Sequence, residues 1–117
     1  NIITRTSNRP NHYRECYDSI REQDLSKVEQ NVSVCHWTTS DDDATFNYLH
    51  EKYDNIRIVK CSRPKRKNMN HFPYHRYLGQ VINLIDNDGW VLILDDDHTL
   101  ANSHSLATIF RVLAETD

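Results

Sequence analysis

Three consecutive aspartates, Asp95, Asp96 and Asp97, form the group in this chain whose type and spacing best suit chemistry. They directly follow five apolar residues, 90–94 (WVLIL). Adjacent carboxylates repel one another, and a fold tolerates them when a hard divalent cation or a hydrogen-bond network neutralises their charge. Because side chains alternate along an extended segment, Asp95 and Asp97 can share one side while Asp96 faces another. The run therefore predicts a site for Mg²⁺ or Mn²⁺. The structural alternative is an acidic turn that caps a helix.

Two more polar segments follow short apolar ones. After Ile2 and Ile3 the chain reads TRTSNRP, which supplies Thr4, Arg5, Thr6 and Arg9. After the apolar residues that lead to Trp37 it reads TTSDDD, which supplies Asp41 and Asp42. If each apolar segment is a strand of one parallel sheet, all of these groups follow the carboxyl ends of strands. That is the edge at which open α/β sheets bind their ligands.

The elements that must position these groups alternate between strand and helix. Strand patterns cover residues 2–3, 32–37, 55–61 and 90–94. Apolar residues at helical spacing predict helices at about 11–24, after the TTSDDD cap, from 74 to about 87, and after residue 105. This alternation predicts an α/β fold, a mostly parallel sheet flanked by helices with right-handed crossovers. The 90–94 strand should be buried on both faces.

Size and composition indicate one soluble globular domain. The chain has 117 residues, of which 38% are hydrophobic and 26% charged, so it can build a single modest core. A net charge of -3 without a basic face or an aromatic platform argues against nucleic-acid binding. No run of about 20 apolar residues predicts a membrane span. No leader pattern precedes Ile2, and Cys16, Cys35 and Cys61 are expected to be free buried thiols. We expect a cytoplasmic rather than a secreted domain.

The order of these motifs resembles the nucleotide-binding half of GT-A glycosyltransferases of the family 2 type. IITRTSNRP before an amphipathic helix is similar to the opening of that family, and WVLILDDDHTL is similar to its DXD strand. TTSDDD resembles the acidic turn that reads the nucleobase, and Arg76-Tyr77 resembles the basic helix start near the DXD motif. The likeness covers almost all 117 residues in order. It implies a GT-A, Rossmann-like fold and a metal-dependent glycosyltransferase.

The resemblance also implies a role for each matching residue. The nucleoside pocket would be lined by Thr4, Arg5, Thr6 and Arg9, and the base would donate a hydrogen bond to Asp42 or Asp41. Arg76 would lie near the base or the phosphates, Asp95 would contact the ribose or the metal with Asp96 beside it, and Asp97 would coordinate the metal. The ligand would be a nucleoside diphosphate sugar, with a UDP-sugar as the expected donor. Mn²⁺ or Mg²⁺ would stabilise the departing diphosphate as a Lewis acid while the sugar passes to an acceptor hydroxyl.

The chain departs from the family pattern after the aspartates. Family members continue into an acceptor half, with a further metal ligand that is often a histidine and, in inverting enzymes, an acidic general base. Only residues 98–117 follow Asp97 here. We therefore expect residues 1–117 to be a nucleotide-sugar-binding domain truncated before its acceptor half, and no catalytic residue can be named.

Two other interpretations of the aspartates stay open. Asp95-Asp96-Asp97-His98-Thr99 also resembles the motif of haloacid dehalogenase-type phosphatases, with Asp95 as nucleophile and Asp97 as acid/base. That motif normally opens its domain, whereas three predicted strands precede it here. The other alternative is a non-catalytic binding domain whose aspartates are structural. The basic run 65–67 is expected to be solvated, and His71, His75 and His98 are not expected to be ligands.

Overall fold

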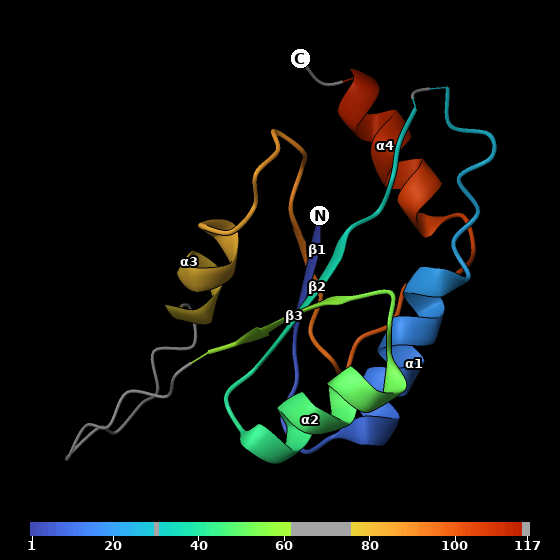
Figure 1. Cartoon of the computed structure of the whole chain (residues 1–117). Coiled ribbons are helices and arrows are strands. Elements are labelled where there is room, and N and C mark those ends of the chain that lie inside the picture. Colours follow the sequence, from blue (N-terminus) through green and yellow to red (C-terminus); the bar gives the residue numbers. More distant parts are fainter. Residues whose placement is uncertain (30, 62–75, 116–117) are drawn as a thin grey trace, which may run out of the picture. The chain divides into compact units, whose positions relative to one another are not determined.

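The computed structural model describes residues 1–29, 31–61 and 76–115 and confirms the α/β fold class. Strand and helix alternate from β1 to α4, as the sequence predicts. The four strands form one parallel sheet in the order β3-β2-β1-β4 (Figure 1). This is the order of the first four strands of a Rossmann-like sheet, in which the direction of strand progression reverses between β1 and β4.

The chain divides into two compact units. Unit 1 comprises Asn1–Asn8 and Cys35–Leu94 and contains the sheet together with α2 and α3. Unit 2 comprises Arg9–Val34 and Asp95–Asp117 and contains α1 and α4. The chain therefore passes from one unit to the other three times, and one of these passages is the peptide bond between Leu94 and Asp95.

The inner strands of unit 1 are β1 and β2. The strand bounds are Ile2–Arg5 for β1, His36–Ser40 for β2, Arg57–Lys60 for β3 and Leu92–Ile93 for β4. β1 pairs with β2 on one side and with β4 on the other, and Ile3 is in register with both Trp37 and Ile93. β1 contains two isoleucines and a threonine, β2 contains two threonines, and every residue of β2 is buried. Such β-branched side chains favour strands that are covered on both faces.

Two helices of unit 1 lie on this sheet. α2 (Asp43–Lys52) contacts β2 and β3, and α3 (Arg76–Ile82) contacts β2. Val81 of α3 is completely buried and forms a core cluster with Ile3 and Trp37. Because Ile3 and Trp37 are register partners on adjacent strands, α3 covers one face of the sheet at its centre.

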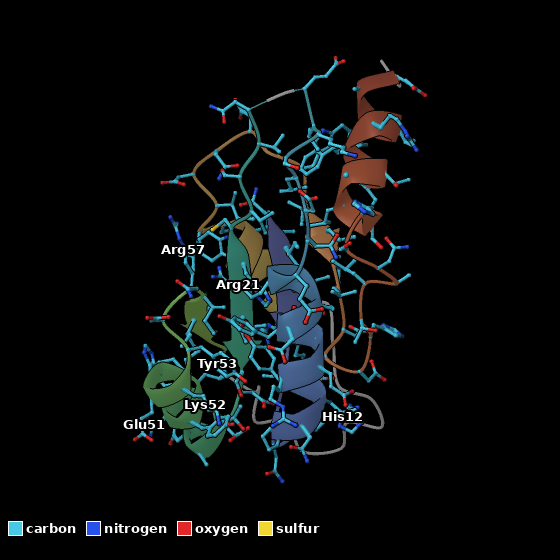
Figure 2. The ribbon with its side chains drawn as sticks, turned by 90° about the vertical axis from the view of Figure 1, so that its right-hand side faces the viewer. His12, Arg21, Glu51, Lys52, Tyr53 and Arg57 are labelled. Atoms are coloured by element: carbon cyan, nitrogen blue, oxygen red, sulfur yellow. The ribbon has the colours of Figure 1, made fainter. Side chains whose placement is uncertain are left out.

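Several charged side chains of the helices and of β3 are exposed to solvent. The exposed residues labelled in Figure 2 are His12 and Arg21 on α1, Glu51 and Lys52 on α2, and Arg57 on β3. Tyr53, which follows α2, is instead buried. The Arg57 guanidinium lies 5.0 Å from the centroid of the Trp37 ring, so it covers the indole while its charge stays in water.

Unit 2 is built from α1 (Pro10–Arg21), α4 (Ser105–Glu115) and the segments next to them. The proline at the start of α1 suits the first helical position, where no backbone N–H is needed. Gln23 joins the two parts of the unit, because its amide nitrogen donates to the Asn102 carbonyl (2.7 Å) and its oxygen accepts from the Leu106 N–H (2.9 Å). The buried helix residues are Tyr13, Cys16 and Ile20 on α1 and Leu106 on α4.

The second strand differs from its prediction. The sequence predicts it at 32–37, with Thr38, Thr39 and Ser40 in a capping turn, but β2 spans His36–Ser40. Val34 is exposed, whereas the three hydroxyl residues are at most 1% exposed. A buried hydroxyl is tolerated when it is hydrogen-bonded, and the Thr39 hydroxyl bonds to the thiol of Cys61. Polar residues can therefore form a central strand here.

The fourth strand also differs from its prediction. The 90–94 run should form a strand buried on both faces, but β4 covers only Leu92–Ile93. Trp90 is 64% exposed and Ile93 is 48% exposed. The reason is the position of the strand, because among the described residues β4 pairs with β1 alone and so lies at an edge of the sheet.

Helix bounds shift from the predictions by a few residues. α1 ends at Arg21 rather than near residue 24, and α3 gives way to turns after Ile82 rather than reaching residue 87. The predicted start of that helix at residue 74 lies outside the described residues.

The cysteines agree only in part with the prediction of free buried thiols, because Cys35 is not fully buried. Cys16, Cys35 and Cys61 are all free thiols, and Cys16 and Cys61 are buried while Cys35 is half-buried. Within the part of the chain that the structure describes, no helix combines the length and the apolar character that crossing a bilayer requires.

Candidate functional site

The aspartate run forms a turn in unit 2, and Leu94 alone separates it from β4 in the chain. The His98 N–H donates to the Asp95 carbonyl oxygen (3.0 Å), which closes the turn. Asp95, Asp97 and His98 are exposed, and one possible ligand atom from each lies within 4.8 Å of the others. His98 Nδ1 is 3.9 Å from Asp95 Oδ2 and 3.8 Å from Asp97 Oδ1. The turn thus gathers two carboxylates and an imidazole at one point on the surface.

Asp96 points elsewhere. It is only 6% exposed, and its Oδ1 lies 3.4 Å from Nη1 of Arg9, which belongs to the same unit. Nη2 of Arg9 lies 3.8 Å from Oδ2 of Asp97. Asp95 and Asp97 therefore share one side and Asp96 another, as the sequence argument expects. The cause is different, because a hydrogen-bonded turn rather than an extended segment separates the side chains.

The chemistry and spacing of this group fit a divalent cation. Two atoms bound to one ion at about 2.1 Å lie at most about 4.2 Å apart. The distances from His98 Nδ1 to the two carboxylates satisfy this limit. All three candidate ligand atoms lie within 4.8 Å of one another, and rotation of the exposed side chains can bring them closer. Carboxylates suit Mg²⁺ and Mn²⁺, whereas imidazole suits transition metals. The mixed donor set therefore fits Mn²⁺ better than Mg²⁺.

A second group of predicted residues meets in unit 1, where β1, β2 and α3 surround a small hollow. Its lining residues are Arg5, Thr39, Ser40, Asp41, Cys61, Arg76 and Tyr77. The Arg5 guanidinium lies 4.0 Å from the Asp41 carboxylate and 6.0 Å from the centroid of the Tyr77 ring. The volume of about 10 Å³ admits a single water molecule. Burial raises the pKa of the Cys61 thiol in its wall, so this thiol is neutral near pH 7.

Asp42 has a structural role that accounts for its carboxylate. Its Oδ1 accepts from the Thr45 N–H (2.7 Å) at the start of α2, and its Oδ2 accepts from the Ser7 hydroxyl (2.7 Å). This confirms the predicted helix cap. Burial alone raises the pKa of Asp42, but hydrogen bonds from Ser7, Thr45 and Ser40 outweigh it and hold the pKa below its ordinary value. Of the two predicted base-reading residues, Asp41 is the one that lines the hollow.

Thr4 and Thr6 lie inside unit 1. Both are at most 2% exposed. The Thr4 hydroxyl is hydrogen-bonded to Nε2 of His36 (2.9 Å), and burial lowers the pKa of His36 to about 4. These threonines thus belong to the core of the sheet, whereas Arg5 between them lines the hollow.

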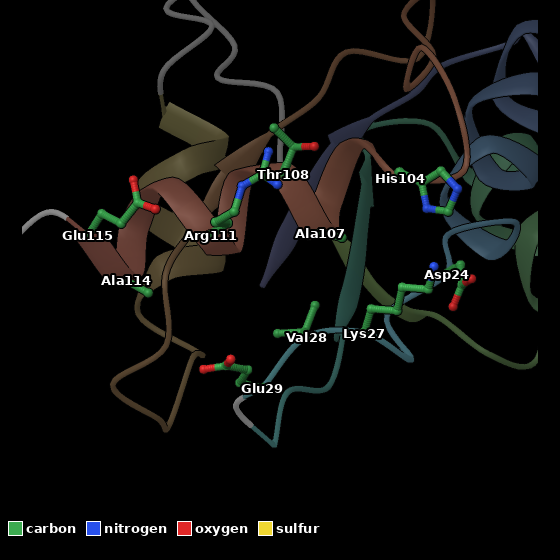
Figure 3. Close-up of a pocket in the computed structure, with 10 residues that line it drawn as sticks. All are labelled: Asp24, Lys27, Val28, Glu29, His104, Ala107, Thr108, Arg111, Ala114 and Glu115. Carbon is green, nitrogen blue, oxygen red and sulfur yellow. The ribbon is translucent and has the colours of Figure 1, made fainter.

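A much larger cavity lies within unit 2, between residues 24–29 and α4 (Figure 3). Its volume is about 610 Å³. Its lining carries three acidic and three basic side chains, Asp24, Glu29 and Glu115 with Lys27, His104 and Arg111. The lining therefore mixes carboxylates with the cations of Lys27 and Arg111, and this mixture does not indicate one class of ligand. None of the residues that the sequence singled out lines it.

The fold and these groups define a Rossmann-like α/β protein with a carboxylate and imidazole group that follows β4 in the chain. Comparisons with protein-family models, with curated proteins and with solved structures gave no match to this chain. The functional argument therefore depends on the residues themselves.

Sequence reasoning missed part of each group. It set His98 aside, although the turn brings this imidazole to Asp95 and Asp97. The signal available in the sequence was that His98 directly follows the aspartates, so that a single turn can bring its imidazole next to their carboxylates. It also missed Thr39 and Cys61, whose place in the hollow depends on strand pairing. The basic run 65–67, His71 and His75 lie outside the described residues.

Proposed function

We propose that this chain is a glycosyltransferase domain that binds a nucleoside diphosphate sugar through Mn²⁺ or Mg²⁺, with a UDP-sugar as the first candidate. The sugar would be transferred to an acceptor hydroxyl. The observation that carries the proposal is the exposed group of Asp95, Asp97 and His98, which begins one residue after the β4 segment of the sheet. β4 and β1 are the strand pair at which strand order reverses. In open α/β sheets, the carboxyl ends of such a pair are the usual place for a nucleotide.

The metal would be held by Asp95, Asp97 and His98. Bound there, it would supply Lewis-acid stabilisation of the diphosphate oxygens as the sugar departs. The residues of the turn would orient it, since the Asp95 carbonyl and the His98 N–H fix the backbone between the ligands. Mn²⁺ is the better candidate because one of the three ligands is an imidazole.

The hollow in unit 1 would by itself offer groups that recognise a nucleoside. Tyr77 offers a ring face and Arg5 a planar cation, and both kinds of group stack on nucleobases. Asp41 offers an oxygen that can accept from the N–H of a uracil ring, and Arg76 offers a positive charge for phosphate. Because the hollow admits one water molecule, the base would lie across its rim. Asp42 is assigned to the helix cap instead.

Isothermal titration calorimetry tests this proposal. UDP and UDP-glucose are titrated into the protein with Mn²⁺ and again with EDTA, and we expect binding that requires the metal. Asp41→Asn should weaken UDP binding in the presence of Mn²⁺ by about tenfold, since it removes one charged hydrogen-bond acceptor. Asp88→Asn is the matched control and should leave binding unchanged. Asp88 is an exposed aspartate of the same unit, and its substitution changes the net charge by the same amount. Equal binding with and without metal, or no binding by the folded protein, overturns the proposal.

A phosphatase is the second candidate, because Asp95 and Asp97 also have the spacing and the shared side that a nucleophile and an acid/base need. In this sheet the motif follows an edge strand that comes fourth in the chain. Hydrolysis of p-nitrophenyl phosphate with Mg²⁺, lost in Asp95→Asn and accompanied by no UDP binding, would favour this candidate over the glycosyltransferase. Absence of metal binding, nucleotide binding and hydrolysis would leave a non-catalytic binding domain.

A further inference from the structure

Arg9 makes an unusual double contact beside the candidate metal group. Its guanidinium reaches two different carboxylates with two different nitrogens, Nη1 to Asp96 Oδ1 (3.4 Å) and Nη2 to Asp97 Oδ2 (3.8 Å). The planar fork of an arginine allows this geometry, whereas the single ammonium of a lysine does not. All three residues belong to unit 2.

Both ends of this arrangement are anchored. Arg9 is the residue that precedes the first turn of α1, and its carbonyl accepts the first helical hydrogen bond from the Tyr13 N–H (3.0 Å). The side chain of Asp96 is only 7% exposed, while that of Asp97 is 47% exposed. Asp96 is therefore the fixed carboxylate, and Asp97 is the one whose orientation needs to be held.

The two oxygens of Asp97 face different partners. Oδ2 faces Arg9, and Oδ1 faces Nδ1 of His98 (3.8 Å). A contact to Oδ2 thus fixes the rotation of the carboxylate and leaves Oδ1 on the side of Asp95 and His98, where the ligand atoms gather.

We propose that Arg9 is a positioning residue for the metal, which holds Asp97 in its ligating orientation from the buried anchor Asp96. This inference rests on the proposed metal site. It gives Arg9 a place beside the metal rather than in the nucleoside pocket. Groups that orient metal ligands from behind are known to change metal affinity by about 10- to 100-fold when they are removed.

The proposal makes a prediction of sign. Arg9 is a cation beside the candidate metal group, so by charge alone its removal should tighten the binding of Mn²⁺. By positioning, its removal should weaken binding, because Asp97 then loses its fixed orientation. A decrease in affinity is therefore the result that only positioning explains.

The experiment measures the binding of Mn²⁺ alone, from the loss of the electron paramagnetic resonance signal of the free ion. We expect Arg9→Met to bind Mn²⁺ about tenfold more weakly than the unsubstituted protein. Arg9→Lys should also bind more weakly, although it keeps the charge, because one ammonium cannot hold both carboxylates. The matched control is Arg14→Met, an exposed arginine on α1 with the same change in net charge, which should leave affinity unchanged.

Thermal unfolding of each variant separates positioning from a purely structural role. A variant that unfolds at a lower temperature but binds Mn²⁺ with unchanged affinity overturns the inference, as does tighter binding by Arg9→Met. If Arg9→Met does not fold, Arg9→Lys decides by the same criterion. If the unsubstituted protein takes up no Mn²⁺, the proposed metal site and this inference fail together. Uptake by the unsubstituted protein with equal uptake by Arg9→Met defeats the positioning role alone.

Discussion

Acidification should destabilise this protein through one buried histidine, His36. It lies on β2, is 5% exposed, and is hydrogen-bonded through Nε2 to the Thr4 hydroxyl. Burial lowers its pKa from 6.5 to about 4, because the charged imidazolium loses its hydration inside the sheet. The unfolded chain therefore binds a proton at a higher pH than the folded protein does. The neutral form contributes its stability above about pH 6.5, and this stability is lost as the pH falls toward 4.

The magnitude follows from the difference between the two pKa values. At about 1.36 kcal/mol per pKa unit, the difference between 6.5 and about 4 corresponds to about 3.4 kcal/mol, which is lost completely only when the pH lies well below 4. Between pH 7 and pH 5 only part of this difference is expressed, and it amounts to about 2 kcal/mol. A loss of this size is a large fraction of the about 5–15 kcal/mol that stabilises a typical domain.

Urea unfolding at pH 7, 6 and 5 measures this effect, with the fluorescence of the buried Trp37 next to His36 as one probe. The unsubstituted protein should lose about 2 kcal/mol more over this range than His36→Gln, which keeps a polar group but does not titrate. His12→Gln is the control, because His12 is exposed and its replacement should leave the pH dependence unchanged. If His36→Gln loses as much stability as the unsubstituted protein, the argument from burial is refuted.

Two further predictions concern the aspartates. Asp97→Asn should weaken metal-dependent UDP binding far more than Asp96→Asn, because Asp97 offers its oxygen to the metal group while Asp96 is buried beside Arg9. Calorimetry compares the two variants. Equal losses of affinity would contradict the inference that Asp96 faces a different side from Asp97. Asp42→Ala should lower the free energy of unfolding by about 1 kcal/mol, because the Thr45 N–H loses its cap. Urea unfolding checks this, and an unchanged midpoint would refute the capping role.

The order of elements could be predicted because it depends on local patterns. Apolar residues at helical spacing, such as Tyr13, Cys16 and Ile20, mark α1 in the sequence, and the same three residues are buried in the structure. The position of β2 could not be predicted in this way. Thr38 and Thr39 have the composition of a capping turn, and only pairing with β1 and β3 makes them a buried strand. Tertiary burial overrides local preference there.

The candidate site shows the same division. The aspartate run could be predicted as a site because three like charges follow an apolar segment, and this pattern is local in the sequence. The inclusion of His98 in the metal group depends on a turn, and the ion pair between Arg9 and Asp96 joins residues that are far apart in the chain. Spacing alone contains no information on such pairs. The hollow around Arg5 and Tyr77 likewise exists only because strand order brings β1 and β2 next to α3.

Within the part of the chain that the structure describes, one edge of β4 pairs with no other strand, and this edge affects how the protein behaves in concentrated solution. An edge strand presents unpaired N–H and C=O groups to any other chain, and the exposed Trp90 and Ile93 add apolar surface beside them. Self-association through this edge would reduce the soluble fraction without any loss of folding. Colloidal behaviour and folding stability can therefore vary independently in this chain. Ile93→Lys places a charge where natural sheets use one to block edge pairing, and it should raise solubility while the unfolding midpoint stays nearly the same.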